Sequence, residues 1–139
     1  MSTTTASPDL SDGSGRAAAN LVVLVGTLSS APRLRDLPSG TTLASIEVTT
    51  AATPRESVPV SVFDPPATVA NLDEGDSIVL VGRVRRRFYR AGGTTQSRTE
   101  VVAERVARTR ASRSVGRVVA IADERLADLT ASLDRDGGA

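Results

Sequence analysis

The chain has 139 residues, and its only aromatic residues are two phenylalanines and one tyrosine. It contains no cysteine and no histidine, and all 17 basic residues are arginine. These absences exclude thiolate, imidazole and Schiff-base lysine chemistry, and also a phosphate-loop lysine. No apolar run reaches the roughly 18 residues of a membrane span, and the N-terminus lacks a secretory signal pattern, so we expect a soluble cytoplasmic protein.

The length predicts one folded domain with tails, and the small polar residues 1–19 are typical of a disordered N-terminal tail. Prolines and a glycine mark 31–40 as a loop, and Gly92 and Gly93 mark 90–97 as a flexible hairpin loop. Five segments have the alternating or β-branched apolar composition of strands: 20–28, 41–52, 56–63, 76–89 and 98–107.

A short helix is expected at 64–75, because Asp64 can cap it, Pro65 suits its first position and Gly75 can end it. Five strands with one helix between the third and the fourth is the chain order of an all-β OB-fold barrel. We therefore predict an OB-fold domain over 20–110. Along 41–52, the alternation indicates that Ala44, Ile46 and Val48 face inward, with Thr42 and Thr50 beside them.

The apolar period changes at residues 114–133, where apolar residues recur at spacings of three or four. This pattern predicts an amphipathic helix within a C-terminal region, 111–139, whose last residues fray. The apolar stripe either packs on the chain's own barrel or meets another subunit or a protein partner. Its members are Val115, Val118, Val119, Ala122, Leu126, Leu129 and Leu133.

Charge is distributed in blocks along the chain. Residues 83–117 carry 11 arginines and 2 acidic residues, whereas 1–82 carry 4 arginines and 9 acidic residues. Such a basic block favours a polyanionic partner, and the alternative is an arginine-rich surface that only maintains solubility. The block opens with RVRRRFYR (83–90), in which alternation places Arg83, Arg85, Arg87 and Tyr89 on one outward face. Phe88 is then expected on the core side, with Arg86 left unexplained at the rim.

Arginines beside an aromatic ring on an open strand are typical of a surface that grips a single strand, because guanidinium groups bind phosphates and rings stack on bases. A solvated hairpin is the alternative. Residues 20–107 also resemble bacterial single-stranded DNA-binding proteins, on the segments NLVVLVGTL (20–28), APRLRDLPSGTTLASIEV (31–48), VPVSVF (58–63), ATVANLDEGDSIVLVGRV (67–84) and TEVVAERV (99–106).

The resemblance implies an OB fold that assembles, usually as a homotetramer, and wraps single-stranded DNA. It places Phe63 on a stacking phenylalanine, Arg87 on a basic residue and Tyr89 on a stacking tryptophan of the family. The expected nucleic-acid-binding residues are Arg83, Arg85, Arg87, Tyr89, Phe63, Arg90 and Arg98. The sequence departs from the family near Pro54 and Ser57, where the family has tryptophans, at the acidic Asp73–Glu74, and in lacking the acidic C-terminal tip.

We therefore expect a non-enzymatic protein that binds single-stranded DNA without sequence specificity, as a homo-oligomer (tetramer or dimer), in replication, recombination or repair. No cofactor, metal or membrane is expected, and the location would be cytoplasmic and nucleoid-associated. The alternative function is a protein-interaction module, with a protein partner on the helix 114–133 and weak or lost DNA binding. An enzyme is the weakest hypothesis, since only the acidic turn of Asp73, Glu74 and Asp76 offers candidate groups.

Overall fold

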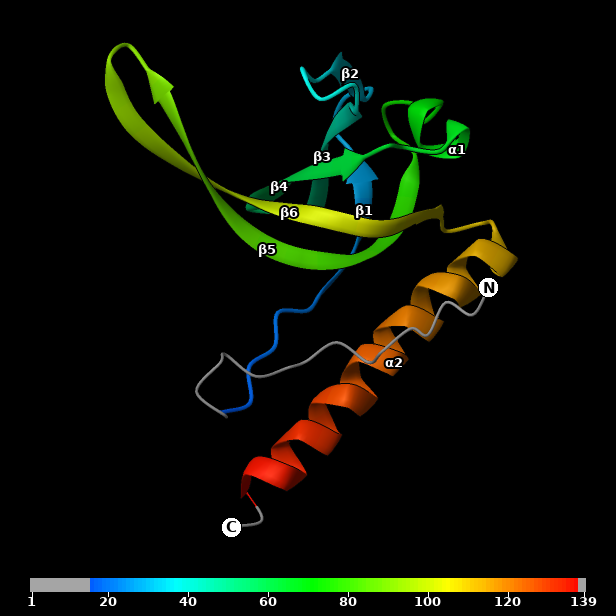
Figure 1. Ribbon diagram of the computed structural model, residues 1–139. Helices are drawn as coiled ribbons and strands as arrows, with labels where there is room; N and C mark the ends of the chain where they lie inside the picture. Colours follow the sequence, from blue (N-terminus) through cyan, green and yellow to red (C-terminus); the bar gives the residue numbers. More distant parts are fainter. Residues whose placement is uncertain (1–15, 138–139) are drawn as a thin grey trace.

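The computed structural model describes residues 16–137. Most of the predicted N-terminal tail, residues 1–15, and the last two residues of the chain therefore lie outside the described part. Within it the elements follow in the order β1 (Val22–Leu28), β2 (Arg33–Asp36), β3 (Thr42–Ala52), β4 (Arg55–Phe63), α1 (Ala67–Ala70), β5 (Ser77–Ala91), β6 (Thr94–Arg108) and α2 (Ser112–Gly137). The fold is mostly β-sheet with one long C-terminal helix (Figure 1).

The strands form a single sheet in the order β1-β5-β6-β4-β3-β2. The first strand, β1, also pairs with β3 near the other end of this order. This arrangement is consistent with the predicted OB fold. The strand β2 was not predicted, and residues 31–40 are therefore not simply a loop. Between Pro32 and Pro38 the short segment keeps its backbone N–H groups, and Arg33–Asp36 pairs antiparallel with β3 from Ser45 to Thr42.

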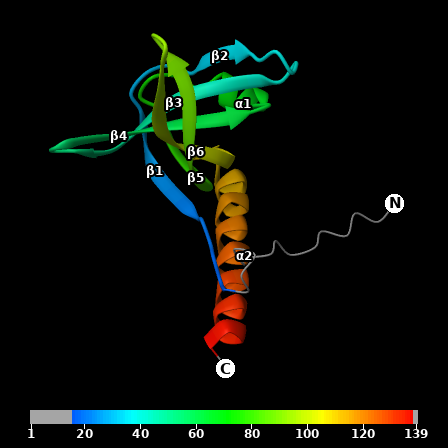
Figure 2. The ribbon, with the colours of Figure 1, turned by 60° about the vertical axis from the view of Figure 1, so that its left-hand side comes forward.

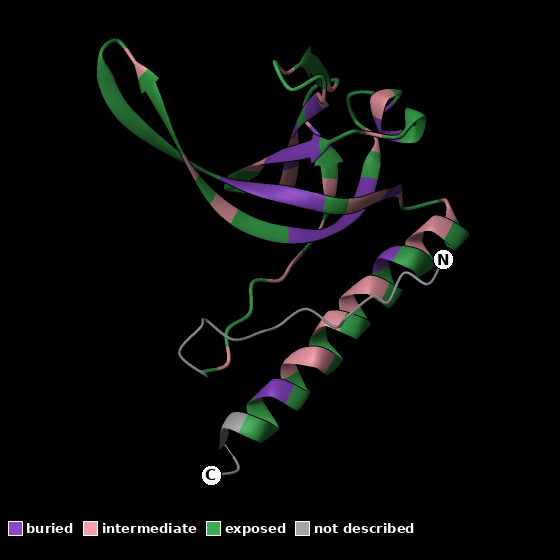
Figure 3. Ribbon diagram, viewed as in Figure 1, coloured by how far each residue is buried: buried purple, intermediate pink, exposed green. Residues whose placement is uncertain are grey.

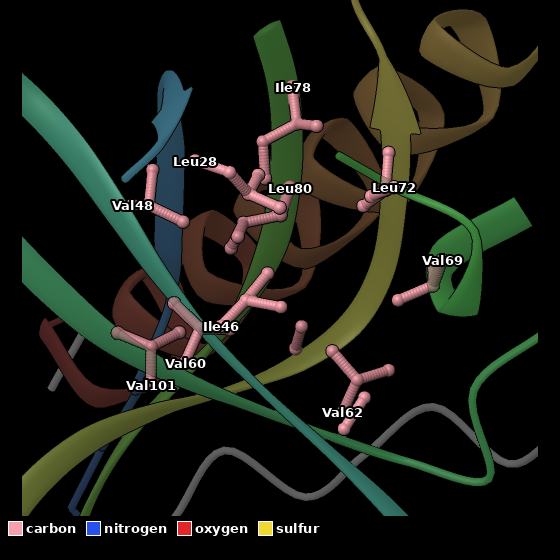
Figure 4. Close-up of a cluster of buried hydrophobic side chains, with 12 residues drawn as sticks. Leu28, Ile46, Val48, Val60, Val62, Val69, Leu72, Ile78, Leu80 and Val101 are labelled. Carbon is pink, nitrogen blue, oxygen red and sulfur yellow. The ribbon is translucent and has the colours of Figure 1, made fainter. Parts of the chain in front are cut away.

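Aliphatic side chains from every strand except β2, together with those of α1, fill the inside of the sheet (Figure 4). Leu80 and Ile78 of β5 are fully buried there, and so are Val48 and Ala44 of β3. The predicted inward face of residues 41–52 is thus confirmed for Ala44, Ile46 and Val48. A core of this composition is closely packed without any aromatic residue, since β-branched side chains fit a pleated surface well.

Strands β5 and β6 continue beyond the rest of the sheet as a long two-stranded arm, which is almost entirely exposed (Figures 1 and 3). The predicted loop 90–97 is much too long, because pairing continues to Ala91 and Thr94. Gly92 and Gly93 make the turn alone, with φ values of 59° and 82°. A two-residue hairpin turn of type I′ requires positive φ at both central positions, and glycine adopts it without steric cost.

The sheet is bent where the arm begins. The pairing of β5 with β6 shifts register between Val81 and Gly82, leaving one extra residue on β6. A side chain at Gly82 would collide with the backbone oxygen of Val102. Gly82 therefore permits the close approach of the two strands at the point where they leave the core.

The helix α1 is shorter than predicted and begins differently. It covers only Ala67–Ala70, starts after Pro66 and has no side-chain cap. Asp64 has φ of 49° and lies in the connection before the helix, so its expected capping role is wrong. Because Pro66 disfavours the helical conformation at Pro65, the helix cannot start there. It begins two residues later than expected, at Ala67, with Pro66 extended at its N-cap.

The helix α2 contains the predicted segment 114–133 and extends it at both ends. Its first half packs on the sheet, where Val118 is buried against Val79 and Val81 of β5. An ion pair between Arg125 and Glu104 of β6, 2.7 Å long, also joins the helix to the sheet. The C-terminal half of the helix runs away from the sheet (Figure 2). Neither helix of residues 16–137 has the combination of length and apolarity that would let it cross a lipid bilayer.

Candidate nucleic-acid interface

An open groove of about 440 Å³ lies on the outer face of the sheet, opposite the aliphatic core. Strand alternation creates it, because Ser45 and Glu47 of β3 and Ser61 of β4 point away from the core that Ile46 and Val60 fill. Arginines line the groove from three different strands: Arg33 and Arg35 of β2, Arg87 of β5 and Arg98 of β6. The groove is therefore polar, and its four arginines outnumber its two carboxylates, Glu47 and Glu100.

The carboxylate of Glu100 lies at the centre of this surface and is only 3% exposed. It faces β5 across the strand pair, with Arg85 directly opposite in the register. A terminal nitrogen of Arg85 donates a hydrogen bond of 2.8 Å to Glu100, and Nε of Arg87 lies 3.3 Å from its other oxygen. The Nε–H of Arg87 does not point at that oxygen, so the second contact is electrostatic and not a hydrogen bond.

Glu100 is ionised at neutral pH. Its burial acts to raise the pKa, but the hydrogen bonds from Arg85 and Ser61, together with the charges of Arg85 and Arg87, outweigh burial and hold the pKa below its usual value. One negative charge thus fixes two guanidinium groups, and one positive charge remains uncompensated. Each arginine has five N–H donors, so both still have donors free for a phosphate.

The aromatic residues on this face carry arginines over their rings. The guanidinium carbon of Arg85 lies 5.3 Å from the ring centre of Phe63, and that of Arg87 lies 5.6 Å from the ring centre of Tyr89. Both distances are typical of cation–π contacts. The hydroxyl of Tyr89 donates to Gln96 across the arm at 3.3 Å. Phe63 and Tyr89 remain more than a third exposed, so each presents part of its ring to solvent.

Of the predicted binding residues, the structure therefore brings together Arg85, Arg87, Phe63 and Tyr89. Arg98 joins them, because it pairs with Arg87 in the strand register and lines the same groove. Its guanidinium lies 3.5 Å from Glu47, and both side chains are about half exposed. Such an exposed pair is weak, so a phosphate can replace Glu47 at little cost.

Two predicted residues lie elsewhere. Arg83 borders a separate hollow with Asn20, Glu104 and Arg125, close to α2. Arg90 is on the opposite face of the arm from Tyr89, where its guanidinium donates to the backbone oxygen of Gly93 at 3.2 Å. Arg85, Arg87 and Tyr89 lie on the outward face of β5, as predicted. Arg83 lies on the same face but borders a different hollow.

Phe88 does not belong to the core, and that expectation is wrong. Its side chain is 64% exposed, and Val84 on the same face is also exposed. The side chains of β5 still alternate between its two faces. After Gly82, however, the strand extends beyond the core, so the face that was inward is exposed to solvent. Arg86 is explained by the same fact: it is exposed beside Phe88, with its guanidinium carbon 5.7 Å from the ring centre.

The acidic turn at 73–76 has a structural role. One oxygen of Asp76 accepts a hydrogen bond of 2.8 Å from the backbone N–H of Asp73, and the same oxygen lies 3.5 Å from Arg108. That hydrogen bond, with the charge of Arg108, holds the pKa of Asp76 below its usual value. No group of three or more metal-ligating side chains occurs within residues 16–137.

Sequence reasoning missed Arg33, Arg35, Glu47 and Glu100. The segment Arg33-Leu34-Arg35 did carry a signal, because alternation puts both arginines on one face of a strand. The flanking prolines concealed it by suggesting a loop. Glu100 carried no signal at all, since its contact with Arg85 depends on a strand register that the sequence does not show.

An outward groove lined by arginines, with exposed aromatic rings beside it on a β-sheet, is typical of the class of proteins that bind oligonucleotides. A comparison with known protein families shows which family of that class the chain belongs to. The model of the single-strand binding protein family matches residues 19–109, which is more than half of the chain. The chain belongs to this family, a family of non-catalytic DNA-binding proteins, and the match supports single-stranded DNA binding as its general activity.

Proposed function

We propose that the chain binds single-stranded DNA without sequence specificity along the arginine groove, as a homo-oligomer that acts in replication, recombination or repair. In this proposal residues 20–110 form an OB-fold barrel and 111–139 a separate C-terminal region. The observation that carries it is the pairing of Arg85 and Arg87 with Glu100, beside a groove that is lined by Arg33, Arg35, Arg87 and Arg98. Bound DNA would place the protein with the nucleoid.

The groove suits a phosphate backbone better than it suits bases. Its cations come from both sides, so a strand lying in it can contact Arg35 on one side and Arg87 on the other. Glu100 would position Arg85 and Arg87, because its short contacts limit the conformations of two long side chains. The groove presents no array of donors and acceptors matched to one base, and this favours binding of any sequence.

Bases would stack on Tyr89 and Phe63, which border the arginines and keep part of each ring exposed. Base–aromatic stacking contributes about 1–3 kcal/mol per base and tolerates every base. With only two rings on this face, stacking can supply a minor share of the affinity. Phosphate contacts must supply the larger share.

The fluorescence of the chain tests the stacking directly. The chain contains one tyrosine and no tryptophan, so its intrinsic emission reports on Tyr89 alone. Titration with an oligothymidine should quench this emission, with a midpoint equal to that of an independent binding assay such as filter retention. Binding that leaves the emission unchanged would remove Tyr89 from the proposed interface.

Charge reversal tests the groove. The double variant Arg85→Glu, Arg87→Glu should abolish oligothymidine binding at low salt. The matched control is Arg86→Glu, Arg90→Glu, which changes the charge by the same amount on the opposite face of the same arm. It should bind more weakly than the wild type and far more tightly than the groove variant. Equal losses in the two variants would show that the face of the arm does not matter.

Salt dependence gives a count of the phosphates. Each phosphate neutralised on a single strand contributes about −0.7 to the slope of log K against log salt. Contacts to the four arginines that line the groove and to the neighbouring Arg85 would give a slope of about −3.5. A slope near zero would contradict a mechanism dominated by phosphates.

A second candidate function is a protein-interaction module with weak or lost DNA binding. The observation that favours it is the small aromatic surface, since Phe63 and Tyr89 are the only rings beside the groove and the chain has no tryptophan. The two functions differ in a simple measurement. A chain that passes unretained through single-stranded DNA-cellulose at low salt, with no change of tyrosine emission on titration, supports the second.

A further inference from the structure

The apolar residues along one side of α2 have the spacing of a helix that pairs with another helix. Six of them follow one another at intervals of four, three, four, three and four residues: Val115, Val119, Ala122, Leu126, Leu129 and Leu133. Intervals that alternate between four and three are those of a heptad seam, in which apolar residues repeat every 3.5 residues. We call these six residues the α2 seam.

The chain's own sheet covers only the beginning of the seam. Val115 and Ala122 pack against the cluster formed by Val79, Val81 and Val118. Val119, Leu126 and Leu133, which lie one heptad apart, are 48%, 49% and 51% exposed. The C-terminal half of α2 runs away from the sheet (Figure 2). In this half Leu126 and Leu133 are exposed, and Leu129 is half-buried.

The charges on α2 indicate what covers the seam. Residues 112–122 contain two arginines and no acidic residue, whereas residues 123–137 contain five acidic residues and two arginines. Two copies of the helix that pair antiparallel therefore bring the basic half of each against the acidic half of the other. A parallel pair would place acidic half against acidic half, which is unfavourable. The surface is thus complementary to itself in one orientation only.

We propose that a second copy of this chain binds the α2 seam, so that the two helices form an antiparallel pair about a two-fold axis near the middle of the seam. The proposal rests on the homo-oligomer proposed above and names the surface that forms it. It does not depend on DNA binding, because the groove lies on β2–β6, whereas the exposed residues of the seam, Val119, Leu126 and Leu133, lie on α2.

The seam is long enough to support such a pair. From residue 115 to residue 133 it extends about 27 Å, at about 1.5 Å per residue. An isolated helix of this length is marginal in water, because nucleating it is unfavourable. In this chain the packing of Val118 and the ion pair of Arg125 with Glu104 already stabilise the helix. The free energy of helix formation therefore does not weaken the association. A preorganised seam can therefore pair where an isolated peptide would not.

The first experiment measures mass in solution by light scattering at tens of micromolar. The wild type should have at least twice the chain mass of 14.4 kDa. The double variant Leu126→Glu, Leu133→Glu should have half the wild-type mass. The control, Ala127→Glu, Ala131→Glu, adds the same charge to exposed positions on the opposite side of the helix and should leave the mass unchanged.

The outcomes separate the two proposals. A monomeric wild type overturns both the homo-oligomer and the seam pairing, and leaves the groove to be judged by its own binding assay. An oligomer whose mass is unchanged in the Leu126→Glu, Leu133→Glu variant overturns only the seam pairing. Since both leucines are about half exposed, the variant should keep the wild-type circular dichroism, which shows that it has folded.

A second experiment tests the antiparallel orientation. The chain has no cysteine, so a single introduced cysteine is its only thiol. Leu126→Cys lies close to the proposed axis, whereas two copies of Leu133→Cys would be about 27 Å apart along the paired helices. A short bismaleimide should join two chains through residue 126 and not through residue 133. Efficient joining at both positions would indicate a parallel pair and overturn the proposed orientation.

Discussion

Residues 77–82 and 83–91 are the two halves of one strand, β5, and they meet different neighbours. In the first half both faces are covered, since Ile78 and Leu80 point into the core and Val79 and Val81 lie beneath α2. In the second half no residue is buried (Figure 3). The backbone alternates identically in both halves, so the difference comes entirely from the elements packed around the strand. Alternation assigns a residue to a face, and only the tertiary structure decides what that face contacts.

The largest expected effect is in the covered half. Leu80→Ala removes a fully buried side chain from the core, and should lower the free energy of unfolding by about 2–5 kcal/mol. Urea denaturation followed by circular dichroism measures it. The comparison is Val84→Ala, four residues further along the same face, where the side chain is exposed and the loss should stay below about 0.5 kcal/mol. Similar losses at both positions would mean that the arm is covered in solution.

The next effect is at the junction of the two halves. Gly82→Ala would place a methyl group against the backbone oxygen of Val102, so the strands must separate at the bulge. We expect a loss of about 1–3 kcal/mol in the free energy of unfolding, typical of overpacking. Gly116→Ala in α2 is the control, because nothing surrounds that position and alanine favours the helix. It should be neutral or stabilising in the same urea titration.

A smaller loss of stability is expected at Glu100, whose carboxylate on β6 pairs with Arg85 and Arg87 on β5. Glu100→Gln leaves Arg85 and Arg87 without their shared carboxylate. Because both arginines are about a third or more exposed, water screens part of this loss, and we expect about 1–2 kcal/mol. Denaturant titration at pH 7 measures it, with Glu104→Gln, an exposed pair with Arg125, as the milder comparison.

The same carboxylate makes stability dependent on acid pH. The pKa of Glu100 is lower in the folded chain than its usual value of 4.5, so the unfolded chain takes up a proton first as the pH falls. The contribution of Glu100 is therefore complete above pH 4.5 and is lost as the pH falls through the lower folded-state pKa. Denaturation curves of the wild type and of Glu100→Gln should differ at pH 6 and converge in acid. A constant difference across this range would contradict the ionised pair.

The smallest effect is expected at Phe88, and a comparison with Tyr89 distinguishes the two faces of the arm. Phe88→Ala removes an exposed ring on the face away from the groove, and should change oligothymidine affinity by less than about twofold. Tyr89→Ala, on the groove face, should cost about 1–3 kcal/mol of binding. Fluorescence anisotropy of a labelled oligonucleotide measures both, since it does not depend on the tyrosine. A larger loss at Phe88 would assign the DNA to the other face.

Much of the fold was predictable, because local pattern determined it. Alternation identified the inward residues of β3, and the apolar period identified α2. The errors occurred where a pattern was read without its surroundings. The prolines around Arg33–Asp36 indicated a loop, although the segment is free to pair with β3. Phe88 was assigned to the core from its face alone. Glu100 required the register of two distant strands, which no local pattern contains.

The cations of the groove are all guanidinium groups, and this has a consequence for control of the protein. Guanidinium remains protonated throughout the physiological range, and the chain contains no histidine or lysine to titrate beside it. The affinity for DNA should therefore be nearly independent of pH between about 5 and 9. Acetylation and amine-reactive labels, which act on lysine side chains, find no target in the groove. Its charge can be changed only by competition with carboxylates such as Glu47, by salt, or by modification of arginine itself.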